Sequence, residues 1–188
     1  MTSEKIIYIL KNGKIHLSCE LFPPKQGAEL ANSLEIVNQI AASKPSYMSV
    51  TYGAGGSTVG YSAALAKKVQ DNGMPALAHL TCVKADEAKL AEVLGQLQGF
   101  GVKNILALRG DIPADMQGEE IGSFAHASEL MRFVKQQGDF CVGGAAYPEG
   151  HPESGSLEND IENTKYKVDA GVDFLVTQMF FDNTILYS

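Results

Sequence analysis

The sequence is poor in cysteine, in basic residues and in long apolar runs, and each shortage excludes a class of protein. Its three cysteines, Cys19, Cys82 and Cys141, form an odd number and no CxxC pair. We therefore predict neither a disulfide framework nor a zinc site, and expect three buried free thiols. The longest apolar stretches are strand-sized, well short of the roughly 20 residues that cross a bilayer, so no membrane span is expected.

Basic residues are outnumbered, with 15 Lys and Arg against 22 Asp and Glu and a formal charge of −7. A nucleic-acid-binding surface needs clustered Lys and Arg, so small molecules are the expected partners and nucleic acid is not. The first 14 residues lack the long apolar segment and the cleavage site of a secretory signal. We therefore expect a cytoplasmic protein.

The chain contains a repeat of strand and helix with a period of about thirty residues, the size of a βαβ unit. With 188 residues, 45% of them hydrophobic and 20% charged, the composition predicts one soluble domain over residues 1–188. Strands apolar on both faces, as in a buried parallel sheet, are predicted at residues 15–20, 47–51, 76–81, 104–108, 140–145 and 174–178.

Amphipathic helical patterns lie between the predicted strands. Apolar residues recur at three- and four-residue steps from Leu30 to Ile40 and again from Leu90 to Leu97. Glycines that can adopt the left-handed conformation are expected to end four helices, at Gly73, Gly101, Gly138 and Gly171.

Each predicted strand is followed or ended by a polar residue, and the six strands give Glu20, Thr51, His79, Arg109 with Asp111, Tyr147 and Gln178. Such groups meet at one mouth in a (β/α)₈ barrel, where catalytic side chains stand at the carboxyl ends of parallel strands. An open doubly wound sheet is the alternative. That fold would usually carry GxGxxG after its first strand, where this chain has Phe22-Pro23-Pro24-Lys25, so the barrel is favoured.

Six motifs in this order resemble the methylenetetrahydrofolate reductase family and span nearly the whole chain. They are Glu20-Leu21-Phe22-Pro23-Pro24-Lys25, Val50-Thr51-Tyr52-Gly53-Ala54-Gly55-Gly56-Ser57-Thr58, His79-Leu80-Thr81-Cys82, Leu108-Arg109-Gly110-Asp111, Ala146-Tyr147-Pro148-Glu149-Gly150-His151-Pro152-Glu153 and Thr177-Gln178-Met179-Phe180-Phe181-Asp182. The resemblance implies a (β/α)₈ barrel that binds FAD. It also implies reduction of 5,10-methylenetetrahydrofolate to 5-methyltetrahydrofolate, a step of one-carbon and methionine metabolism, with NADH or NADPH as hydride donor.

Two carboxylates are implied to be catalytic. Glu20 would be the general acid that protonates a folate nitrogen, and burial under a flat cofactor would raise its pKa for that task. Asp111 would lie near both flavin and pterin and help to hold the folate. A solvated loop carboxylate at Glu20 and a salt-bridged turn at Asp111 are the alternatives.

The resemblance implies a larger set of FAD-binding residues, with roles for flavin, pyrophosphate and adenosine. Arg109 suits a pyrophosphate because its guanidinium offers several donors in a rigid fork. Asp160 and Lys167, seven residues apart, are expected on one helix face, although a solvated surface would explain them equally well. The expected FAD-binding set is Thr51, His79, Leu108, Arg109, Gly110, Asp111, Ala127, Tyr147, His151, Asp160, Asn163 and Lys167.

Folate contact is implied for Gln178 and Asp111, because an amide can both donate to and accept from a pteridine edge. Phe180 and Phe181 are expected in the core rather than stacked on a ligand. The chain departs from the family pattern at His126 and Glu129, where a tyrosine and an aspartate are common.

The sequence stops at Ser188, inside the expected sixth barrel helix, so we expect a C-terminally truncated barrel of about six parallel strands. Open strand edges would favour aggregation, a homo-oligomer or a complex with another subunit. A truncated, non-catalytic flavin- or folate-binding subunit is therefore the alternative function. An unrelated barrel lyase or aldolase would need a Schiff-base lysine or metal ligands at strand ends, and the predicted ends carry neither.

Overall fold

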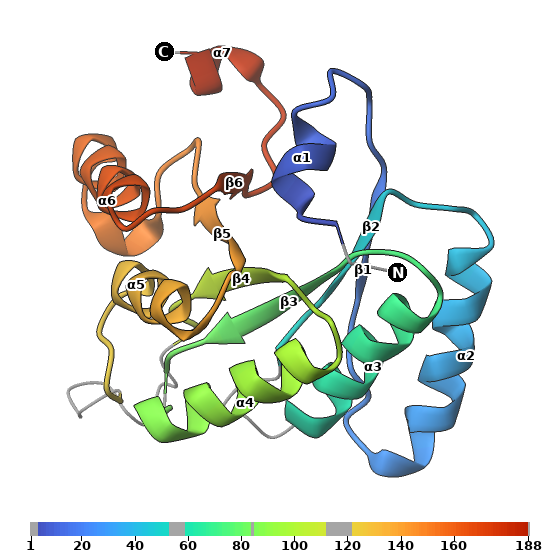
Figure 1. Ribbon diagram of the computed structural model, residues 1–188. Helices are drawn as coiled ribbons and strands as arrows, with labels where there is room; N and C mark the ends of the chain where they lie inside the picture. The colour runs from blue at the N-terminus through green and yellow to red at the C-terminus, as the bar shows by residue number, and fades with distance from the viewer. Residues whose placement is uncertain (1–3, 53–58, 84, 112–121, 188) are drawn as a thin grey trace.

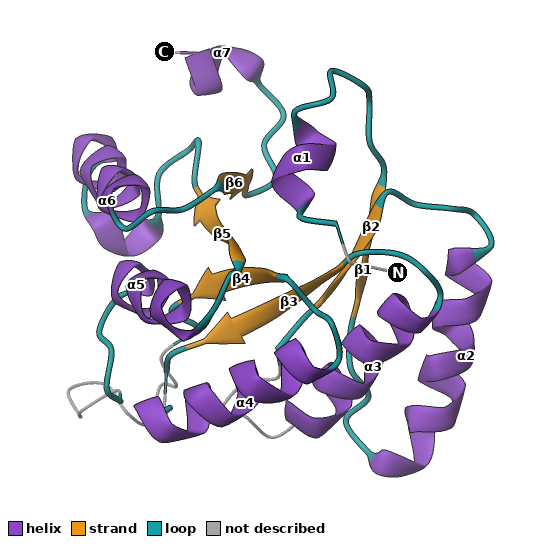
Figure 2. Ribbon diagram, in the orientation of Figure 1, coloured by secondary structure: helices purple, strands orange, loops and turns teal. Residues whose placement is uncertain are grey.

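Six parallel strands form the centre of the protein (Figures 1 and 2). A computed structural model describes residues 4–52, 59–83, 85–111 and 122–187. The strand order in the sheet is the chain order, and each strand pairs in parallel with the next. The strands are β1 (Ser18–Leu21), β2 (Tyr47–Val50), β3 (Ala76–Thr81), β4 (Asn104–Leu108), β5 (Cys141–Ala146) and β6 (Phe174–Thr177).

A helix follows each of the six strands, as expected for βα units, and a further helix precedes the first strand. The helices are α1 (Ile6–Leu10), α2 (Leu30–Ala41), α3 (Val59–Asp71), α4 (Glu87–Gly99), α5 (Ala127–Gln137), α6 (Leu157–Asp169) and α7 (Asn183–Tyr187), with the short 3₁₀ turns η1 (Gly27–Glu29) and η4 (Pro152–Ser154). The sheet curls with α2, α3 and α4 along its outer side, while α1 lies on the opposite side (Figure 1). The predicted incomplete (β/α)₈ barrel with six strands is therefore confirmed.

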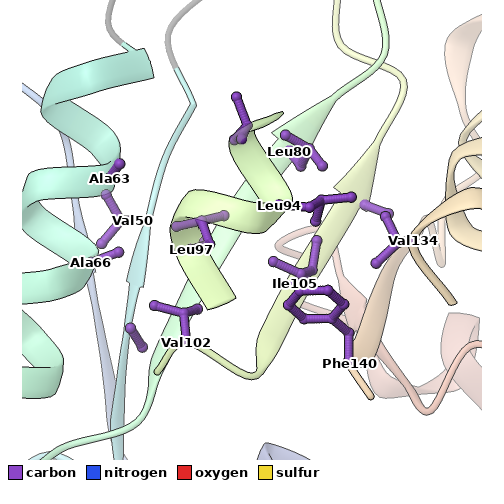
Figure 3. Close-up of a cluster of buried hydrophobic side chains, with 14 of the residues drawn as sticks. Val50, Ala63, Ala66, Leu80, Leu94, Leu97, Val102, Ile105, Val134 and Phe140 are labelled. Carbon is purple, nitrogen blue, oxygen red and sulfur yellow. The ribbon is translucent and has the colours of Figure 1, made fainter. Parts of the chain in front are cut away.

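The main core lies between the sheet and its outer helices. Leu90, Val93, Leu94 and Leu97 of α4 are all buried, which confirms the amphipathic pattern read from the sequence. Leu94 points toward the strand residues Leu80 and Ile105 and toward Val134 of α5 (Figure 3). Burial of side chains this size contributes about 1.5–3 kcal/mol each, so the outer layer fixes the curl of the sheet.

A second, smaller core fills the inner face near the amino ends of the strands. Leu77, Leu106, Cys141 and Phe174 pack there with Ile6 of α1. Close packing at this point requires Gly143, because a Cβ on that residue would lie 2.6 Å from Cζ of Phe174. The amino end of the half-barrel is therefore plugged, which leaves the carboxyl end for ligands.

Asn104 ties this plug to the sheet. Its side chain is fully buried; its Oδ1 accepts from Ile6 N at 2.8 Å, and its Nδ2 donates to the carbonyls of Glu4 at 3.2 Å and Ala76 at 3.3 Å. A five-residue helix such as α1 is too short to persist alone, so this amide supplies much of its attachment. No periodic pattern in the sequence marks α1, and we did not predict this helix.

Both outer strands of the sheet are more exposed than predicted. The first strand begins at Ser18 rather than at residue 15, since Ile15 is 102% and Leu17 68% exposed. In β6, Leu175 and Val176 are each 38% exposed. Within the described residues β1 pairs only with β2, and β6 only with β5. The expectation of strands apolar and buried on both faces therefore holds for β2 to β5 and is wrong for β1 and β6, which lack a second neighbour.

All four predicted helix-ending glycines lie within two residues after the end of a helix, and three of them are left-handed as expected. Gly73, Gly101 and Gly171 have φ of 79°, 79° and 90°, in the left-handed region. Gly138 does end α5, but its φ of 169° is extended backbone, so the expected left-handed conformation is wrong there. A Cβ there would lie 3.3 Å from the ring of Phe140, and close packing explains the glycine instead.

The cysteines are free, as expected, but only two are buried. Cys82 and Cys141 lie in the interior and Cys19 is half-buried. Burial raises the pKa of the Cys82 thiol to about 11, so this thiol is protonated and unreactive at neutral pH. Among the described residues no helix is both long and apolar enough to cross a membrane, and no cluster of three metal-ligating side chains occurs.

Replacing Asn104 with alanine is expected to destabilise the fold by about 2–4 kcal/mol, because the change removes three hydrogen bonds of a buried side chain, including the one that Ile6 N–H donates. Urea denaturation measures the effect. The exposed Asn72, whose amide donates to Asn38 and to the carbonyl of Lys68, provides a matched control, and Asn72→Ala should change stability by less than about 1 kcal/mol. Equal denaturation midpoints for the two variants would contradict this role of Asn104.

Candidate active site at the carboxyl ends of the strands

A cavity of about 570 Å³ opens at the carboxyl ends of β3, β4 and β5. Its walls come from the turn after β4, the start of α5, the loop after β5 and the inner side of α6. Parallel pairing places these segments at one edge of the sheet, as expected for a barrel. Ten residues predicted from the sequence line it: Leu108, Arg109, Gly110, Asp111, Ala127, Tyr147, His151, Asp160, Asn163 and Lys167.

The α6 wall is built around a buried carboxylate. Asp160 is only 4% exposed and its Oδ1 accepts from Ser154 Oγ at 2.8 Å. Asn163 Nδ2 donates to the same hydroxyl at 3.5 Å. The alternative of a solvated helix surface is therefore wrong for Asp160, which faces inward with Lys167 as the seven-residue spacing predicted.

Lys167 is the cation of this wall. Its Nζ donates to the carbonyl of Ala145 at 2.7 Å and lies 5.6 Å from the ring centroid of Tyr147. Burial lowers the pKa of Lys167, and nearby Asp160 opposes that shift. Tyr147 in turn meets His151 edge-to-face, with ring centroids 4.6 Å apart. This wall combines an aromatic pair with a cation, a set of groups suited to a nucleotide base and its phosphates.

The β4 wall carries Arg109 and the Gly110 turn. Gly110 has φ 87°, and a Cβ there would lie 3.1 Å from Cβ of Thr81, so both backbone conformation and space favour glycine. Arg109 makes two hydrogen bonds to Glu153, with Nη1–Oε2 at 2.6 Å and Nη2–Oε1 at 2.9 Å. The guanidinium of Arg109, which we predicted to bind a pyrophosphate, thus binds the carboxylate of Glu153 in this structure. Asp111 lines the cavity and is exposed.

A second polar group stands on the inner face of the sheet, outside the walls of the cavity. Glu20 on β1 is register partner of Ser49 on β2, whose hydroxyl donates to Glu20 Oε2 at 3.2 Å. His79 Nε2 lies 3.6 Å from the same oxygen. The side chain of Glu20 is 48% exposed and that of His79 9%, so the carboxylate has access to solvent and the imidazole does not.

Burial lowers the pKa of His79, and the carboxylate of Glu20 acts in the opposite direction. The imidazole is therefore neutral at pH 7. Its Nε2 has no hydrogen-bond partner within the described part of the chain. A buried polar atom without a partner is costly, so this nitrogen is a candidate ligand contact.

Four predicted residues do not line the cavity: Glu20, Thr51, His79 and Gln178. Glu20 and His79 are in the inner-face group described above. Thr51 follows β2, where its backbone pairs with Leu21 and its carbonyl accepts from Ser62 Oγ at 3.0 Å. Gln178 is exposed just after β6, and its Oε1 accepts from Met179 N at 3.0 Å. The glycine-rich residues 53–58 lie outside the described part of the chain.

The expectation of a core position for Phe181 is wrong, since this side chain is 89% exposed, while Phe180 is half-buried. Both follow β6, the strand at the edge of the sheet, so little structure packs over them. Sequence reasoning also missed Ser49, Glu153 and Ser154. Ser49 had a usable signal, because it stands beside Glu20 once the two strands are aligned; Glu153 and Ser154 lie in a turn whose direction only the structure shows.

A smaller hollow of about 280 Å³ lies on the outer side among α2, α3 and α4. It is lined by Lys67, Lys68 and Asp71 with apolar neighbours, and none of the predicted site residues reaches it. The carboxyl-end cavity is therefore the candidate active site.

Fold and site together define a curled βα half-barrel with a candidate ligand-binding cavity at the carboxyl ends of the strands. The family model for methylenetetrahydrofolate reductase matches residues 5–188. The chain belongs to the methylenetetrahydrofolate reductase family.

Curated relatives are 34–40% identical to the chain over alignments that cover 90–97% of its length. Methylenetetrahydrofolate reductase 2 of Schizosaccharomyces pombe is 40% identical over 185 residues, which cover 92% of this chain and 29% of that protein. The 5,10-methylenetetrahydrofolate reductase of Escherichia coli is 36% identical over 171 residues, covering 90% and 56%. Methylenetetrahydrofolate reductase (NADH) 1 of Zea mays is 36% identical over 196 residues, covering 97% and 33%. The chain thus spans about a third to a half of these relatives.

Solved structures show the same fold at low identity. A protein from Clostridium thermocellum that binds two copies of 5-methyl-5,6,7,8-tetrahydrofolic acid aligns with a TM-score of 0.66 at 14% identity, covering 98% of this chain and 61% of that one. A phosphonopyruvate hydrolase aligns with a TM-score of 0.65 at 11% identity, covering 97% and 65%. At such identities the likeness concerns the fold alone.

The titration of His79 tests the inner-face group. Its pKa should lie below the ordinary 6.5, and Glu20→Gln should lower it further by removing the carboxylate that favours the imidazolium. Histidine NMR signals followed against pH measure this, with Glu35→Gln on the outer helix α2 as a control that leaves the pKa unchanged. A value above 6.5, or no response to Glu20→Gln, would refute the described contact.

The same shift has a consequence for stability. Because the folded protein binds the His79 proton less tightly than the unfolded chain does, the contribution of this group to stability falls as pH drops below about 6.5.

Proposed function

We propose that this chain carries catalytic residues for the reduction of 5,10-methylenetetrahydrofolate to 5-methyltetrahydrofolate, with FAD as cofactor and NADH or NADPH as hydride donor. The single observation that carries the proposal is that one cavity brings together ten residues predicted for FAD from sequence resemblance alone. The names of the curated relatives support the reaction, and the maize relative's name supports a nicotinamide donor.

The residues present fit FAD in size and in chemistry. A cavity of about 570 Å³ lies within the range of about 300–1,000 Å³ usual for cofactor sites. Tyr147 and His151 offer aromatic surface for an adenine, and Lys167 and Arg109 offer positive charge for the two phosphates. The isoalloxazine would then extend toward the inner face, where Thr51 and the unpaired Nε2 of His79 stand. When bound, FAD supplies the hydride-carrying chemistry that side chains lack.

Glu20 is proposed as the general acid that protonates a folate nitrogen. The hydroxyl of Ser49 fixes the position of the Glu20 carboxyl. Neutral His79 beside it adds no positive charge that would disfavour a protonated carboxyl. Its partial exposure leaves a face open to a ligand, and a flat ligand over it would remove water and favour the protonated form. Asp111, which lines the cavity, and Gln178, which is exposed just after β6, are proposed to hold the folate.

The proposal extends to the location, domain organisation and assembly of the protein. We infer a cytoplasmic protein whose residues 1–188 form a single catalytic-barrel domain. Within the described residues β1 and β6 each pair with one strand only, and such unpaired edges favour a homo-oligomer or a complex with another subunit.

Glu20→Gln tests the proposed acid. With added FAD, we expect NADH-dependent bleaching of the flavin absorbance to stay within about twofold, and methylenetetrahydrofolate-dependent recovery to fall at least about 100-fold, since only folate reduction needs the proton. Stopped-flow absorbance separates the two steps. Glu149→Gln, an exposed carboxylate in the loop after β5, should leave both unchanged.

Two other outcomes would decide against parts of the proposal. Equal loss of both steps in Glu20→Gln would remove Glu20 from the role of acid. Tight flavin binding by the native chain without either step would favour the alternative of a non-catalytic flavin- or folate-binding subunit.

A further inference from the structure

Both Nη atoms of the Arg109 guanidinium donate hydrogen bonds to the carboxylate of Glu153. The two contacts of 2.6 and 2.9 Å form a parallel pair, the geometry in which a guanidinium also binds two phosphate oxygens. Arg109 stands in the cavity wall, 24% exposed, while its partner is 57% exposed. The carboxylate therefore approaches the guanidinium from the solvent side, which is also the side from which a ligand enters.

The charges of the cavity wall show why this contact matters to a ligand. Three carboxylates, Asp111, Glu153 and Asp160, line it against two basic side chains, Arg109 and Lys167. With Glu153 in place the wall carries an excess of negative charge, which disfavours an anion. The balance becomes even if Glu153 turns away, and the fork of Arg109 is then open.

Glu153 can leave without disrupting the turn that carries it. Its backbone N–H donates to Nδ1 of His151 at 3.1 Å, a contact that does not involve its carboxylate. Arg109 is held separately, because its Nε donates to the carbonyl of Gly110 at 3.2 Å. The guanidinium thus stays in the wall when the carboxylate rotates into solvent.

We propose that Glu153 is a specificity-determining residue of this cavity: it holds the guanidinium nitrogens that a ligand diphosphate takes, and it is displaced when that ligand binds. Glu153 therefore competes with anions for Arg109 and lowers the affinity of the site for weak or singly charged ones. A diphosphate succeeds because it brings more charge and reaches Lys167 as well. The inference concerns diphosphates in general, and only its application to FAD rests on the proposed function.

Removal of the competing carboxylate is the test. Inorganic pyrophosphate is titrated into native protein and Glu153→Gln by calorimetry, and FAD by the change in flavin fluorescence. Glu153→Gln should bind both about fivefold tighter, the factor expected for loss of an exposed ion pair. Riboflavin, which has no phosphate, should bind native protein and variant equally.

Two controls isolate the contact with Arg109. Glu149→Gln removes the same charge from the same loop at an exposed position outside the cavity wall, and should change pyrophosphate affinity by less than twofold. In an Arg109→Gln background, Glu153→Gln should give no gain. Equal urea midpoints confirm that the variants are folded, and Glu153→Ala provides a second variant for the same comparison.

The outcomes separate this inference from the assignment of FAD. Weaker or unchanged pyrophosphate binding in both Glu153 variants, or no binding by any protein, overturns the role of Glu153. Tighter pyrophosphate binding without any FAD binding supports Glu153 and overturns the FAD proposal. FAD binding that is the same with and without Glu153 leaves FAD in place and overturns the competition.

Discussion

Parallel pairing of the six strands in chain order is the constraint on which the rest of this structure depends. It sends every strand's carboxyl end to the same edge, so residues more than a hundred positions apart in the sequence meet there. Hydrophobic burial under the outer helices and a plug at the amino end hold the sheet in its curl. The candidate site therefore lies at one end of the sheet, and the segments that follow β2, β3, β4 and β5 contribute to the cavity wall.

The mouth consists of two neighbouring regions with different properties. The cavity beside α6 is aromatic and charged, with paired cations and carboxylates, and suits a nucleotide. The inner face at β1 to β3 carries a carboxylate, a hydroxyl and a neutral imidazole at close range. A cofactor long enough to span both regions would connect the cations of the cavity wall to the carboxylate that we propose as the general acid.

Much of this arrangement could be predicted from the sequence, for identifiable reasons. Apolar runs that end in a polar residue predict buried strands such as β3 and β4. Apolar residues at three- and four-residue steps predict α4. Asp160 and Lys167 were expected on one helix face from their spacing, and they share a wall of the cavity. These are local signals, and the parallel sheet then converts them into neighbours in space.

Other features depend on contacts that no local pattern contains. The hydrogen bonds that attach α1 to Asn104 join residues about a hundred positions apart. Exposure of Ile15, Leu17 and Phe181 follows from the bare edges of the sheet, since an apolar side chain is buried only where a neighbour covers it. The contact between Arg109 and Glu153 could not be predicted from the sequence either. A guanidinium in this family motif indicates a phosphate partner rather than a carboxylate from the next loop.

A crystal structure of the protein soaked with FAD tests the central claim most directly. The account predicts the adenosine between Tyr147 and α6, the diphosphate against Arg109, and the isoalloxazine over the inner face within contact distance of His79. FAD found in the hollow among α2, α3 and α4, or with its flavin ring directed away from β1 to β3, would contradict it.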